Sequence, residues 1–327
     1  MTKQRILHVT TAHQPRDVRI YHKEVVGLLS HGYRVVLATA TDRALTEDAV
    51  EFVPLGATGG SRWRRVPRNF RALAAMLNGK NTLVHIHDPE LLITSIVPLL
   101  LGQRIVYDVH EFYYERLLQS EWVPKPARRF VAELYAFLER TVIPSLAGLV
   151  VVTPDMYERY KKLFPACRLA LVRNLPQISA REIDRARARP RPIEERYVLH
   201  TGGASVTKAF ETLVSMAEFL ASTRNDVTIV NFGPQDLSGY PSKQRQSLLA
   251  RARAANMQLR GLIPYGELLP WIAHAEIGYI GQADTDNERL GLSTKFFEYL
   301  CFGKTRRGVR GGSDRSPCQQ NWNRYCC

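Results

Sequence analysis

Two short segments of the sequence place histidines and carboxylates directly after apolar runs. They are His85, His87 and Asp88 in "HIHDPE", and Asp108, His110 and Glu111 in "YDVHEFYYE". Side chains alternate along a strand, so His85 and His87 share one face and have the look of a metal pair. A two-histidine site needs further ligands, and nothing in the sequence shows that the second segment supplies them. We therefore expect a metal-free pocket whose histidines and carboxylates hydrogen-bond a polyhydroxylated molecule, with one histidine in a purely structural role.

A third polar group follows the first apolar run, in "TTAHQPRDVRI", and contains His13, Asp17 and Arg19. Asp17 is predicted to cap the helix that follows, because its short carboxylate accepts hydrogen bonds from the first free amides. Arg19 then falls in the first helical turn, where a cation has no favourable interaction with the helix dipole. This position favours an anionic ligand in front of Arg19.

The segment "HTGGASVTKAFETL" has the pattern of a strand, a glycine turn and a helix start. Backbone amides freed by Gly202 and Gly203, together with the helix N-terminus and Lys208, are suited to a diphosphate. The segment is neither a Walker loop nor a G-x-G-x-x-G fingerprint. A glycine pair also serves simply to tighten a strand-to-helix connection, and the segment alone leaves both interpretations open.

The segment "STKFFEYLCFGK" predicts one buried helical stripe near residue 300. Its apolar side chains are Phe296, Phe297, Leu300 and Phe302, at a spacing suited to a single helix face. Lys295 and Glu298 lie between them, and for these two we favour a functional role over a structural one.

The elements that must position these groups are short Val-, Ile- and Leu-rich runs that alternate with longer helical patterns. This alternation is typical of parallel strands covered by helices on both faces, in which ligands bind beyond the carboxyl ends of the strands. A charged, proline-flanked stretch over 176–196 is predicted to be a linker. We expect an α/β protein with two doubly wound domains, 1–175 and 197–304. The second has room for one more good helix after "AEIGYIGQ" and is expected to be incomplete.

Taken in order, these motifs resemble the family 4 (group 1) glycosyltransferases, bacterial sugar transferases of GT-B architecture. The resemblance rests on "DVRI", "HIHDPELL", "YDVHE", "VVVTPDMYERY", "VRNLP", the glycine turn and "GLSTKFFEYLCFGK", and runs from the first strand to about Lys304. It implies two Rossmann-like domains facing across a cleft, with the acceptor bound mainly by the first and a nucleotide-sugar by the second. It also implies transfer with retention of configuration, no required metal and no cofactor, since the nucleotide-sugar is a substrate.

The resemblance assigns roles to individual residues. His110 matches the histidine at the cleft floor that hydrogen-bonds the donor sugar, and Glu298 matches the second acid of the Glu-x7-Glu motif, which holds the ribose hydroxyls. Lys208 matches the second basic residue of a pair that grips the diphosphate. The residues expected beside the donor phosphates are Ser293, Thr294 and Lys295, where positive charge and helix-end amides stabilise the leaving nucleotide. The residues expected on the acceptor side are His13, Asp17, Arg19, His87, Asp88 and Glu111.

Two positions depart from the family pattern. Gly203 stands in place of the first basic residue of the diphosphate pair, and Leu290 stands in place of the first acid of the Glu-x7-Glu motif. Glu288 is nearby, with nine residues between it and Glu298, and serves as that acid only if the loop differs. The donor-binding set therefore includes Gly202, Gly203 and Glu288 as well as Lys208 and the helix start.

The residues after Lys304 do not continue the family pattern, which has a proline and a short buried strand of the type P-V-V-A-S. Codons for the observed "TRRGV", read one base later, admit Pro, Val, Val, Ala and Ser. We interpret 305–327 as an aberrant basic tail produced by a frameshift; the alternative is a genuine disordered tail that binds anions. A domain lacking its last elements exposes apolar faces, so we expect marginal stability, aggregation and little or no activity.

The net charge of +14 suits phosphates, nucleic acid or an anionic membrane. Nucleic acid is disfavoured because no recognition-helix, RNP or zinc-finger pattern is present. The segments "RWRRVPRNFRALAAML" and "KPARRFVAELYAFLERTV" mix basic with large apolar side chains. They favour peripheral contact with anionic lipid and solvated basic helix faces about equally.

Localisation is predicted to be cytoplasmic, with a peripheral position at the inner face of the membrane as the second option. The start of the chain has no signal-peptide pattern, and "LLITSIVPLLLG" is too short to span a bilayer.

The leading functional hypothesis is sugar transfer from a nucleotide-sugar to a polysaccharide or glycolipid in bacterial envelope synthesis. The alternatives are another nucleotide-sugar enzyme such as an epimerase, or a non-catalytic protein that binds anions or nucleic acid.

Overall fold

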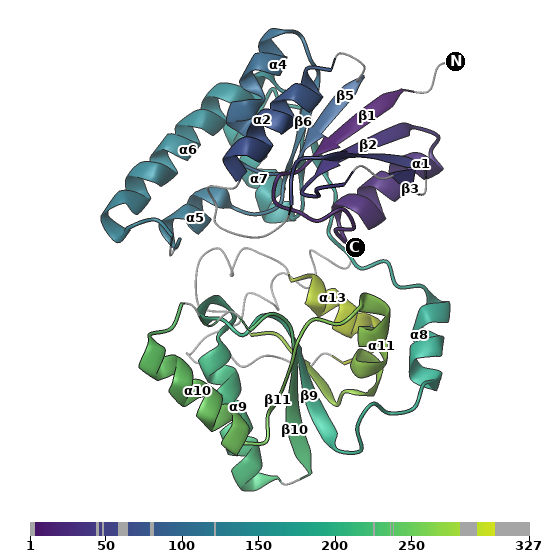
Figure 1. The fold of residues 1–327 in the computed structure, drawn as a ribbon, viewed down its shortest axis with the longest axis vertical. Helices are drawn as coiled ribbons and strands as arrows, with labels where there is room; N and C mark the ends of the chain where they lie inside the picture. Colours follow the sequence, from purple (N-terminus) through teal and green to yellow (C-terminus); the bar gives the residue numbers. More distant parts are fainter. Residues whose placement is uncertain are drawn as a thin grey trace. The chain divides into compact units, whose positions relative to one another are not determined.

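The computed structural model describes residues 4–304, apart from 44–45, 48, 58–64, 79–81, 121, 225, 236, 238 and 282–292. Glu288, Leu290 and the tail from Thr305 therefore lie outside the described residues. The chain divides into two compact units, the first ending at Gln177 and the second beginning at Ile178. Each unit is an α/β layer structure built on its own sheet (Figure 1).

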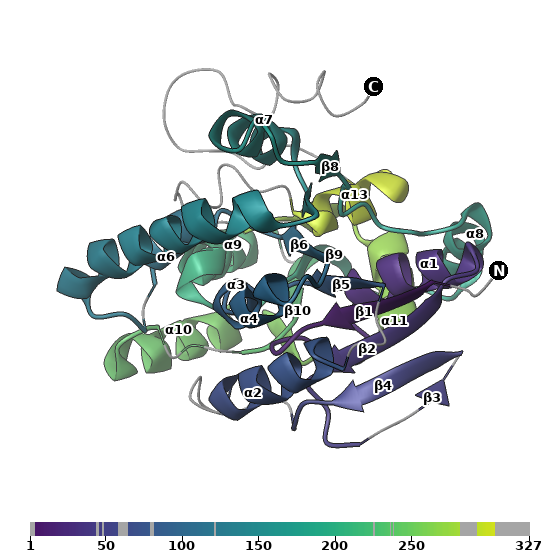
Figure 2. The ribbon, with the colours of Figure 1, turned by 90° about the horizontal axis from the view of Figure 1, so that it is seen from above.

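The first unit contains an eight-stranded sheet in the order β3-β4-β2-β1-β5-β6-β7-β8. Its strands are β1 (Arg5–Val9), β2 (Arg34–Thr39), β3 (Thr46–Glu47), β4 (Val50–Pro54), β5 (Leu83–Ile86), β6 (Ile105–Val109), β7 (Gly148–Val151) and β8 (Leu169–Leu171). The short β3 pairs antiparallel with β4 at one edge (Figure 2), while the other neighbouring strands pair parallel. The carboxyl ends of the central strands β1, β5 and β6 therefore meet at one edge of the sheet.

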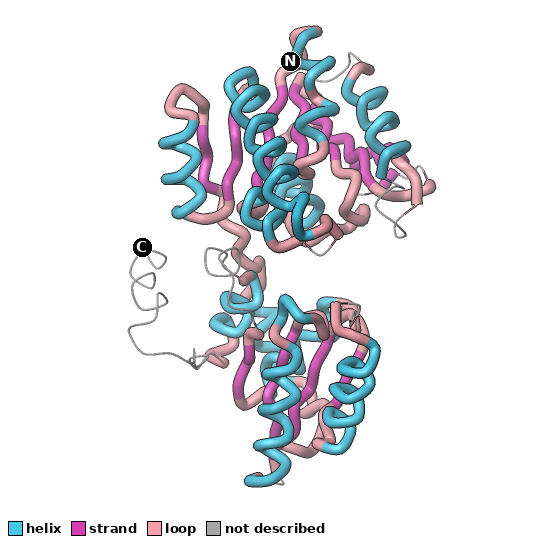
Figure 3. The backbone as a smooth tube through the Cα atoms, turned by 90° about the vertical axis from the view of Figure 1, so that its left-hand side faces the viewer, coloured by secondary structure: helices cyan, strands magenta, loops and turns pink. Residues whose placement is uncertain are grey.

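Helices cover both faces of this sheet (Figure 3). They are the π-helix η1 (Ile20–Val25), α1 (Val26–Ser30), α2 (Arg65–Met76), α3 (Leu91–Thr94), α4 (Ile96–Leu100), α5 (Tyr113–Leu118), η3 (Lys125–Ala127), α6 (Arg128–Val142), η4 (Ile143–Ser145) and α7 (Pro154–Leu163). One core joins Val36 and Ile86 to α2, α3 and α6, and the opposite core joins Val35 and Leu37 to η1. Strands buried on both faces explain why the apolar runs in the sequence are nearly continuous.

The second unit contains a parallel four-stranded sheet in the order β11-β10-β9-β12. Its strands are β9 (Arg196–Thr201), β10 (Val227–Phe232), β11 (Gln258–Arg260) and β12 (Ile277–Tyr279). Its helices are α8 (Ala180–Ala188), η5 (Val206–Lys208), α9 (Phe210–Thr223), α10 (Ser242–Ala254), α11 (Tyr265–His274) and α13 (Thr294–Cys301). Helices α9 and α10 pack on one face of this sheet, and α8, α11 and α13 pack on the other.

Part of the segment predicted as a linker, 176–196, is helical. Helix α8 begins with a capping box in which the Ser179 hydroxyl accepts from the Glu182 amide and the Glu182 carboxylate accepts from the Ser179 amide. Ala186 of this helix is buried against the second sheet. Two reciprocal caps and one buried face stabilise a helix that a charged, arginine-rich sequence alone does not reveal. The predicted domain boundaries themselves stay a prediction.

The expectation of doubly wound α/β sheets is confirmed in both units. The buried stripe of α13 differs from the predicted one: Tyr299 and Phe302 are buried, whereas Phe296 and Phe297 are only half-buried. Among the described helices, none has both the length and the hydrophobicity that a bilayer crossing requires.

Candidate functional site

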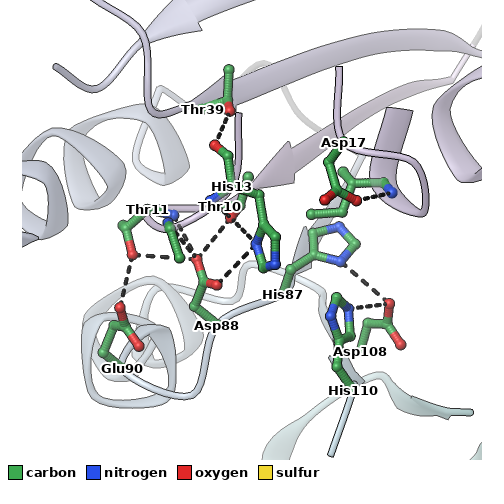
Figure 4. A network of polar contacts seen from close by, with 12 residues as sticks. Thr10, Thr11, His13, Asp17, Thr39, His87, Asp88, Glu90, Asp108 and His110 are labelled. Atoms are coloured by element: carbon green, nitrogen blue, oxygen red, sulfur yellow. Dashed lines mark hydrogen bonds and ion pairs between the residues drawn. The ribbon is translucent and has the colours of Figure 1, made fainter. Parts of the chain in front are cut away.

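In the first unit, Asp88 holds the loop that follows β1. One carboxylate oxygen of Asp88 accepts hydrogen bonds from the Thr10 hydroxyl at 2.8 Å and from the backbone amides of Thr11 and Ala12 at 2.6 and 3.2 Å (Figure 4). Burial raises the pKa of Asp88, but the hydrogen bonds from His13, Thr10 and Thr11 outweigh it and hold the pKa below its usual range. Asp88 is therefore a permanently ionised anchor for the loop.

His13 stands at the outer end of the same loop. Its Nδ1 lies 3.3 Å from the second oxygen of Asp88, its backbone carbonyl accepts from the Thr39 hydroxyl at 2.8 Å, and about a third of its side chain, 32%, is exposed. Burial lowers the pKa of His13, but the hydrogen bond and charge of Asp88 outweigh it and the pKa is raised. The loop thus presents to solvent an imidazole with an increased protonated fraction.

Asp108, the second-to-last residue of β6, contacts the guanidinium of Arg19 and the imidazoles of His87 and His110. Arg19 donates from Nε and Nη2 to its two oxygens, both at 2.8 Å, and His110 Nε2 lies 2.8 Å from one of them. His87 Nδ1 lies 3.3 Å from the same oxygen (Figure 4). Burial raises the pKa of Asp108, but His110, His87 and Arg19 together hold it well below the usual range. The fixed carboxylate sets the orientation of the His110 ring and directs its other nitrogen, Nδ1, away from Asp108.

We expected an anionic ligand in front of Arg19, and the structure pairs Arg19 with a carboxylate of the protein itself. Its guanidinium is buried, is paired with Asp108, and also donates to the Val172 carbonyl at 3.2 Å. The expected capping role of Asp17 is confirmed, because its carboxylate accepts from the backbone amides of Arg19 and Ile20, both at 2.9 Å. Arg19 therefore serves the interior of the unit.

The six residues expected on the acceptor side differ in their access to solvent. Arg19, His87 and Asp88 are buried. His13, Asp17 and Glu111 are partly exposed, and Glu111 pairs with Arg116 at 2.8 Å. His110, which is 23% exposed, lies near His13 with ring centroids 5.7 Å apart. The structure therefore brings the partly exposed imidazoles of His13 and His110 together, with the carboxylates of Asp88 and Asp108 behind them.

In the second unit, the glycine turn after β9 lies against His200. An added Cβ on Gly202 would be 2.7 Å from His200 Nε2 and 3.2 Å from Lys295 Nζ, so only glycine fits here. Asn231 donates its side-chain amide to His200 Nδ1 at 2.9 Å and to the Gly202 carbonyl at 2.8 Å. Because Nδ1 accepts, the neutral ring carries its proton on Nε2, the nitrogen on the side of Gly202 and Lys295.

The surroundings of His200 are electropositive. Burial, Lys295 and Lys208 together lower the pKa of His200 to about 3. Both lysines therefore act on the same buried imidazole, although Lys208 lies in η5 and Lys295 in α13. The described part of this turn combines two ammonium groups with a neutral N–H donor, a set suited to an anion such as a diphosphate.

Helix α13 is held in place at the end of β9. The Tyr299 hydroxyl accepts from the Thr201 amide at 3.0 Å and lies 3.2 Å from the Leu199 carbonyl, to which it donates. An added Cβ on Gly278 would be 2.3 Å from the Tyr299 ring, so the ring packs directly on β12. These contacts fix α13 against the sheet. Lys295, in the first turn of α13 after Ser293 and Thr294, reaches the glycine turn with its Nζ.

Glu298 is buried on the same helix. Its carboxylate lies beside Tyr265 of α11, and burial together with Glu298 raises the pKa of the Tyr265 hydroxyl. A buried carboxylate one turn from Lys295 is suited to accept hydrogen bonds from a pair of ligand hydroxyls. The structure thus places three of the predicted donor-side groups, Gly202, Lys208 and Lys295, around His200, with Glu298 on the helix that carries Lys295.

Sequence reasoning missed His200 and Asn231 in the second unit and Thr10 in the first. His200 directly precedes the T-G-G turn at the end of a strand, and that position was a usable signal. Asn231 lies opposite His200 in the register of β10 with β9, which one sequence does not show.

Comparison with known proteins agrees with this geometry. Residues 19–174 match the family model described as "Glycosyl transferase 4-like domain". No protein with curated function matches the chain at the level of sequence.

Solved structures share the fold. Sucrose-phosphate synthase from Thermosynechococcus elongatus superposes with a TM-score of 0.65 at 16% identity, over 92% of this chain and 80% of that one. HepE from Anabaena, in complex with UDP-glucose, gives 0.61 at 13% identity, over 92% and 79%. WaaG, a glycosyltransferase involved in lipopolysaccharide biosynthesis, gives 0.58 at 14% identity, over 85% and 75%. The expected GT-B fold is confirmed, and the match over 19–174 is to a glycosyltransferase model, the expected class of enzyme.

Proposed function

We propose that this chain, which has the GT-B fold and carries a glycosyl transferase 4-like domain, transfers a sugar from a nucleotide-sugar to a saccharide or lipid-linked saccharide. The observation that carries the proposal is the electropositive turn around Gly202, where Lys208 and Lys295 act on the neutral His200. A nucleotide diphosphate is an anion of the right chemistry for this turn. We further propose that the transfer retains anomeric configuration and serves bacterial envelope synthesis.

In the proposed reaction the bond between the sugar and the donor diphosphate breaks while the acceptor hydroxyl forms the new glycosidic bond. Negative charge develops on the leaving diphosphate, and Lys208, Lys295 and the amides at the start of α13 stabilise it. Glu298 accepts hydrogen bonds from the ribose hydroxyls of the nucleotide. His110, oriented by Asp108, hydrogen-bonds the donor sugar, and His13 contributes on the acceptor side.

Calorimetric titration with UDP and UDP-glucose tests the donor site; the UDP-glucose complex of HepE makes this nucleotide the reasonable first probe. Lys208→Met and Lys295→Met are each expected to weaken binding about tenfold, because a charge-assisted hydrogen bond contributes roughly 1.5–3 kcal/mol. The exposed Lys162 of α7 provides the control, and Lys162→Met should bind like the unchanged chain. Equal affinity in all variants would rule out this turn as the diphosphate site.

Turnover separates an enzyme from a binding protein. Release of UDP from UDP-glucose in the presence of membrane-extracted saccharide acceptors supports sugar transfer. Nucleotide binding without release over a panel of nucleotide-sugars and acceptors would instead favour the non-catalytic anion-binding alternative.

A membrane-peripheral position at the cytoplasmic face is proposed from helix α6. Phe130, Leu134 and Phe137 are 72%, 57% and 64% exposed and follow one helix face, with Arg129 and Arg140 exposed on the same helix. Co-sedimentation with anionic vesicles should be strong at low salt and weaker at high salt. The matched variant Phe130→Ser/Phe137→Ser should lose it, and unchanged sedimentation would count against the membrane proposal.

The frameshift interpretation of 305–327 stays a prediction. Resequencing the gene through the codons for Phe302 to Arg310 tests it. A frame shifted by one base that encodes P-V-V-A-S and continues supports the frameshift. A stop codon directly after the shift refutes it.

A further inference from the structure

A second polar cluster lies inside the first unit, on the sheet face covered by η1. It consists of His8 on β1, His85 and His87 on and just after β5, and Glu24 in η1. His8 and His85 are direct neighbours in the parallel pairing of the two strands. Leu7, Val9, Val84 and Ile86 alternate with the histidines and fill the apolar core on the opposite face, so three imidazoles occupy positions where a buried parallel sheet normally carries apolar side chains.

The four groups lie near the spacing of a first coordination sphere. Glu24 Oε2 lies 4.0 Å from His8 Nδ1, 3.8 Å from His85 Nδ1 and 3.9 Å from His87 Nε2. One ligand atom from each of the four residues lies within 4.8 Å of the others. Tetrahedral zinc with bonds of about 2.0–2.1 Å needs donor atoms about 3.3–3.4 Å apart. His8 Nδ1 and His87 Nε2 lie 2.9 Å apart and share a hydrogen bond. A contraction of roughly half an ångström at Glu24, and an opening of similar size between these two nitrogens in place of their hydrogen bond, bring the measured distances to that spacing.

The cluster is also poorly satisfied by the protein. Among the described residues, both Glu24 oxygens are buried without a hydrogen-bond partner. Glu24 Oε1 lies 3.1 Å from Arg19 Nε, but that N–H is already donated to Asp108. Buried polar atoms are nearly always paired, so this carboxylate calls for a further partner. A cation bound between Glu24 and the imidazole nitrogens nearest to it supplies that partner.

Two features of the backbone and the neighbours point the same way. Glu24 lies in a π-helix whose Glu24 amide donates to the Arg19 carbonyl, five residues back. In an ordinary α-helix, two residues five positions apart point about 140° away from each other. The wider turn of the π-helix lets both Arg19 and Glu24 point toward the sheet. His87 also faces Asp108 with its second nitrogen, at 3.3 Å, the carboxylate–histidine arrangement that orients metal ligands.

We propose that His8, Glu24, His85 and His87 form a closed structural site for one divalent transition-metal ion of the zinc class. The site joins β1, β5 and η1, and its four protein ligands leave no position for substrate, so its role is to stabilise the first unit. It departs from the sequence-based expectation of a metal-free pocket, because two of its ligands come from elements distant in sequence. It also goes beyond the proposed function, and its tests do not depend on sugar transfer.

The first test measures metal content and thermal stability of the whole chain. Purified chain stripped with a chelator and equilibrated with Zn²⁺, then desalted, is expected to retain about one zinc ion and to unfold at a higher temperature than the stripped chain. Glu24→Gln and His8→Gln should lose both effects. His22→Gln, at an exposed histidine of the same π-helix, should keep both. Zinc retention that persists in the Glu24 and His8 variants, or is lost in the His22 variant, overturns the proposal.

The second test needs no variant and so survives a substitution that prevents folding. Co²⁺ added to the stripped, unsubstituted chain should give the intense visible absorption of a four-coordinate nitrogen and oxygen site, and Zn²⁺ should abolish it by displacement. Weak absorption of the hydrated ion, with no change on adding Zn²⁺, overturns the proposal and leaves a metal-free buried histidine network.

Discussion

The α-carbon of Gly202 lies so close to His200 that an added Cβ would be 2.7 Å from the imidazole Nε2. The neighbouring Gly203 is different, because the nearest atom to its added Cβ would be the Pro234 carbonyl oxygen at 3.4 Å. The two glycines therefore have separate roles. Gly202 makes room for His200 and Lys295, and Gly203 occupies a position that tolerates a side chain.

This difference predicts opposite outcomes for two matched substitutions. Gly202→Ala should displace His200 or Lys295 and weaken nucleotide binding by about tenfold or more, which corresponds to about 1.4 kcal/mol. Gly203→Ala should bind nearly as well as the unchanged chain. Calorimetric titration with UDP compares them, and equal losses in both variants would show that the turn acts through general flexibility.

The buried pair of Arg19 and Asp108 should be far more sensitive than an exposed pair. Arg19→Met leaves the Asp108 carboxylate without its two-bond partner and should cost about 3–5 kcal/mol of stability. Arg5→Met removes a pair with the half-exposed Glu51 and should cost about 0–1 kcal/mol. Scanning calorimetry, which resolves the unfolding of separate units, measures both. Similar losses would mean that His87 and His110 already compensate Asp108 fully.

The stability of the second unit should fall in mild acid because of His200. Its folded pKa of about 3 lies below the unfolded value of about 6.5, so the folded state binds fewer protons between these values. The contribution is complete above about pH 6.5 and is lost as pH falls, by up to about 1.4 kcal/mol per pH unit. His200→Gln should flatten the profile between pH 6.5 and 5. If the His200→Gln variant loses stability with falling pH as steeply as the unchanged chain, groups other than His200 cause the loss.

The Glu298 carboxylate is proposed to bind the ribose hydroxyls of the nucleotide. Glu298→Gln removes the charged acceptor and is expected to weaken UDP binding about tenfold while changing 2′-deoxy-UDP binding much less. The exposed Glu267 at the start of α11 gives the control Glu267→Gln, with no change in either affinity. Loss of both affinities in equal measure would place Glu298 away from the ribose.

The architecture was largely predictable from the sequence because a strand buried on both faces leaves a nearly continuous apolar run. The glycine turn at Gly202 was predictable for a similar reason, since turn, strand end and following helix are contiguous. Helix α8 was missed because its stability comes from the Ser179 and Glu182 caps and from burial of Ala186.

The site was less predictable because its partners are distant in sequence. Arg19 was assigned to a ligand, yet its partner Asp108 lies 89 residues away. The pair of His85 and His87 was recognised, but nothing local shows that β1 and η1 add His8 and Glu24. The order of the strands and the π-helical turn bring these distant residues together. Neither feature leaves a periodic signal in a single sequence.

The position of β1 in the middle of its sheet has a consequence for the newly made chain. Translation produces β1 first, but its two neighbours, β2 and β5, begin only at Arg34 and Leu83. Until β5 leaves the ribosome, one edge of β1 has no partner, and the contacts that complete the sheet span long stretches of chain. The nascent first unit therefore passes through a prolonged stage with an open strand edge, in which chaperone binding should favour its correct assembly.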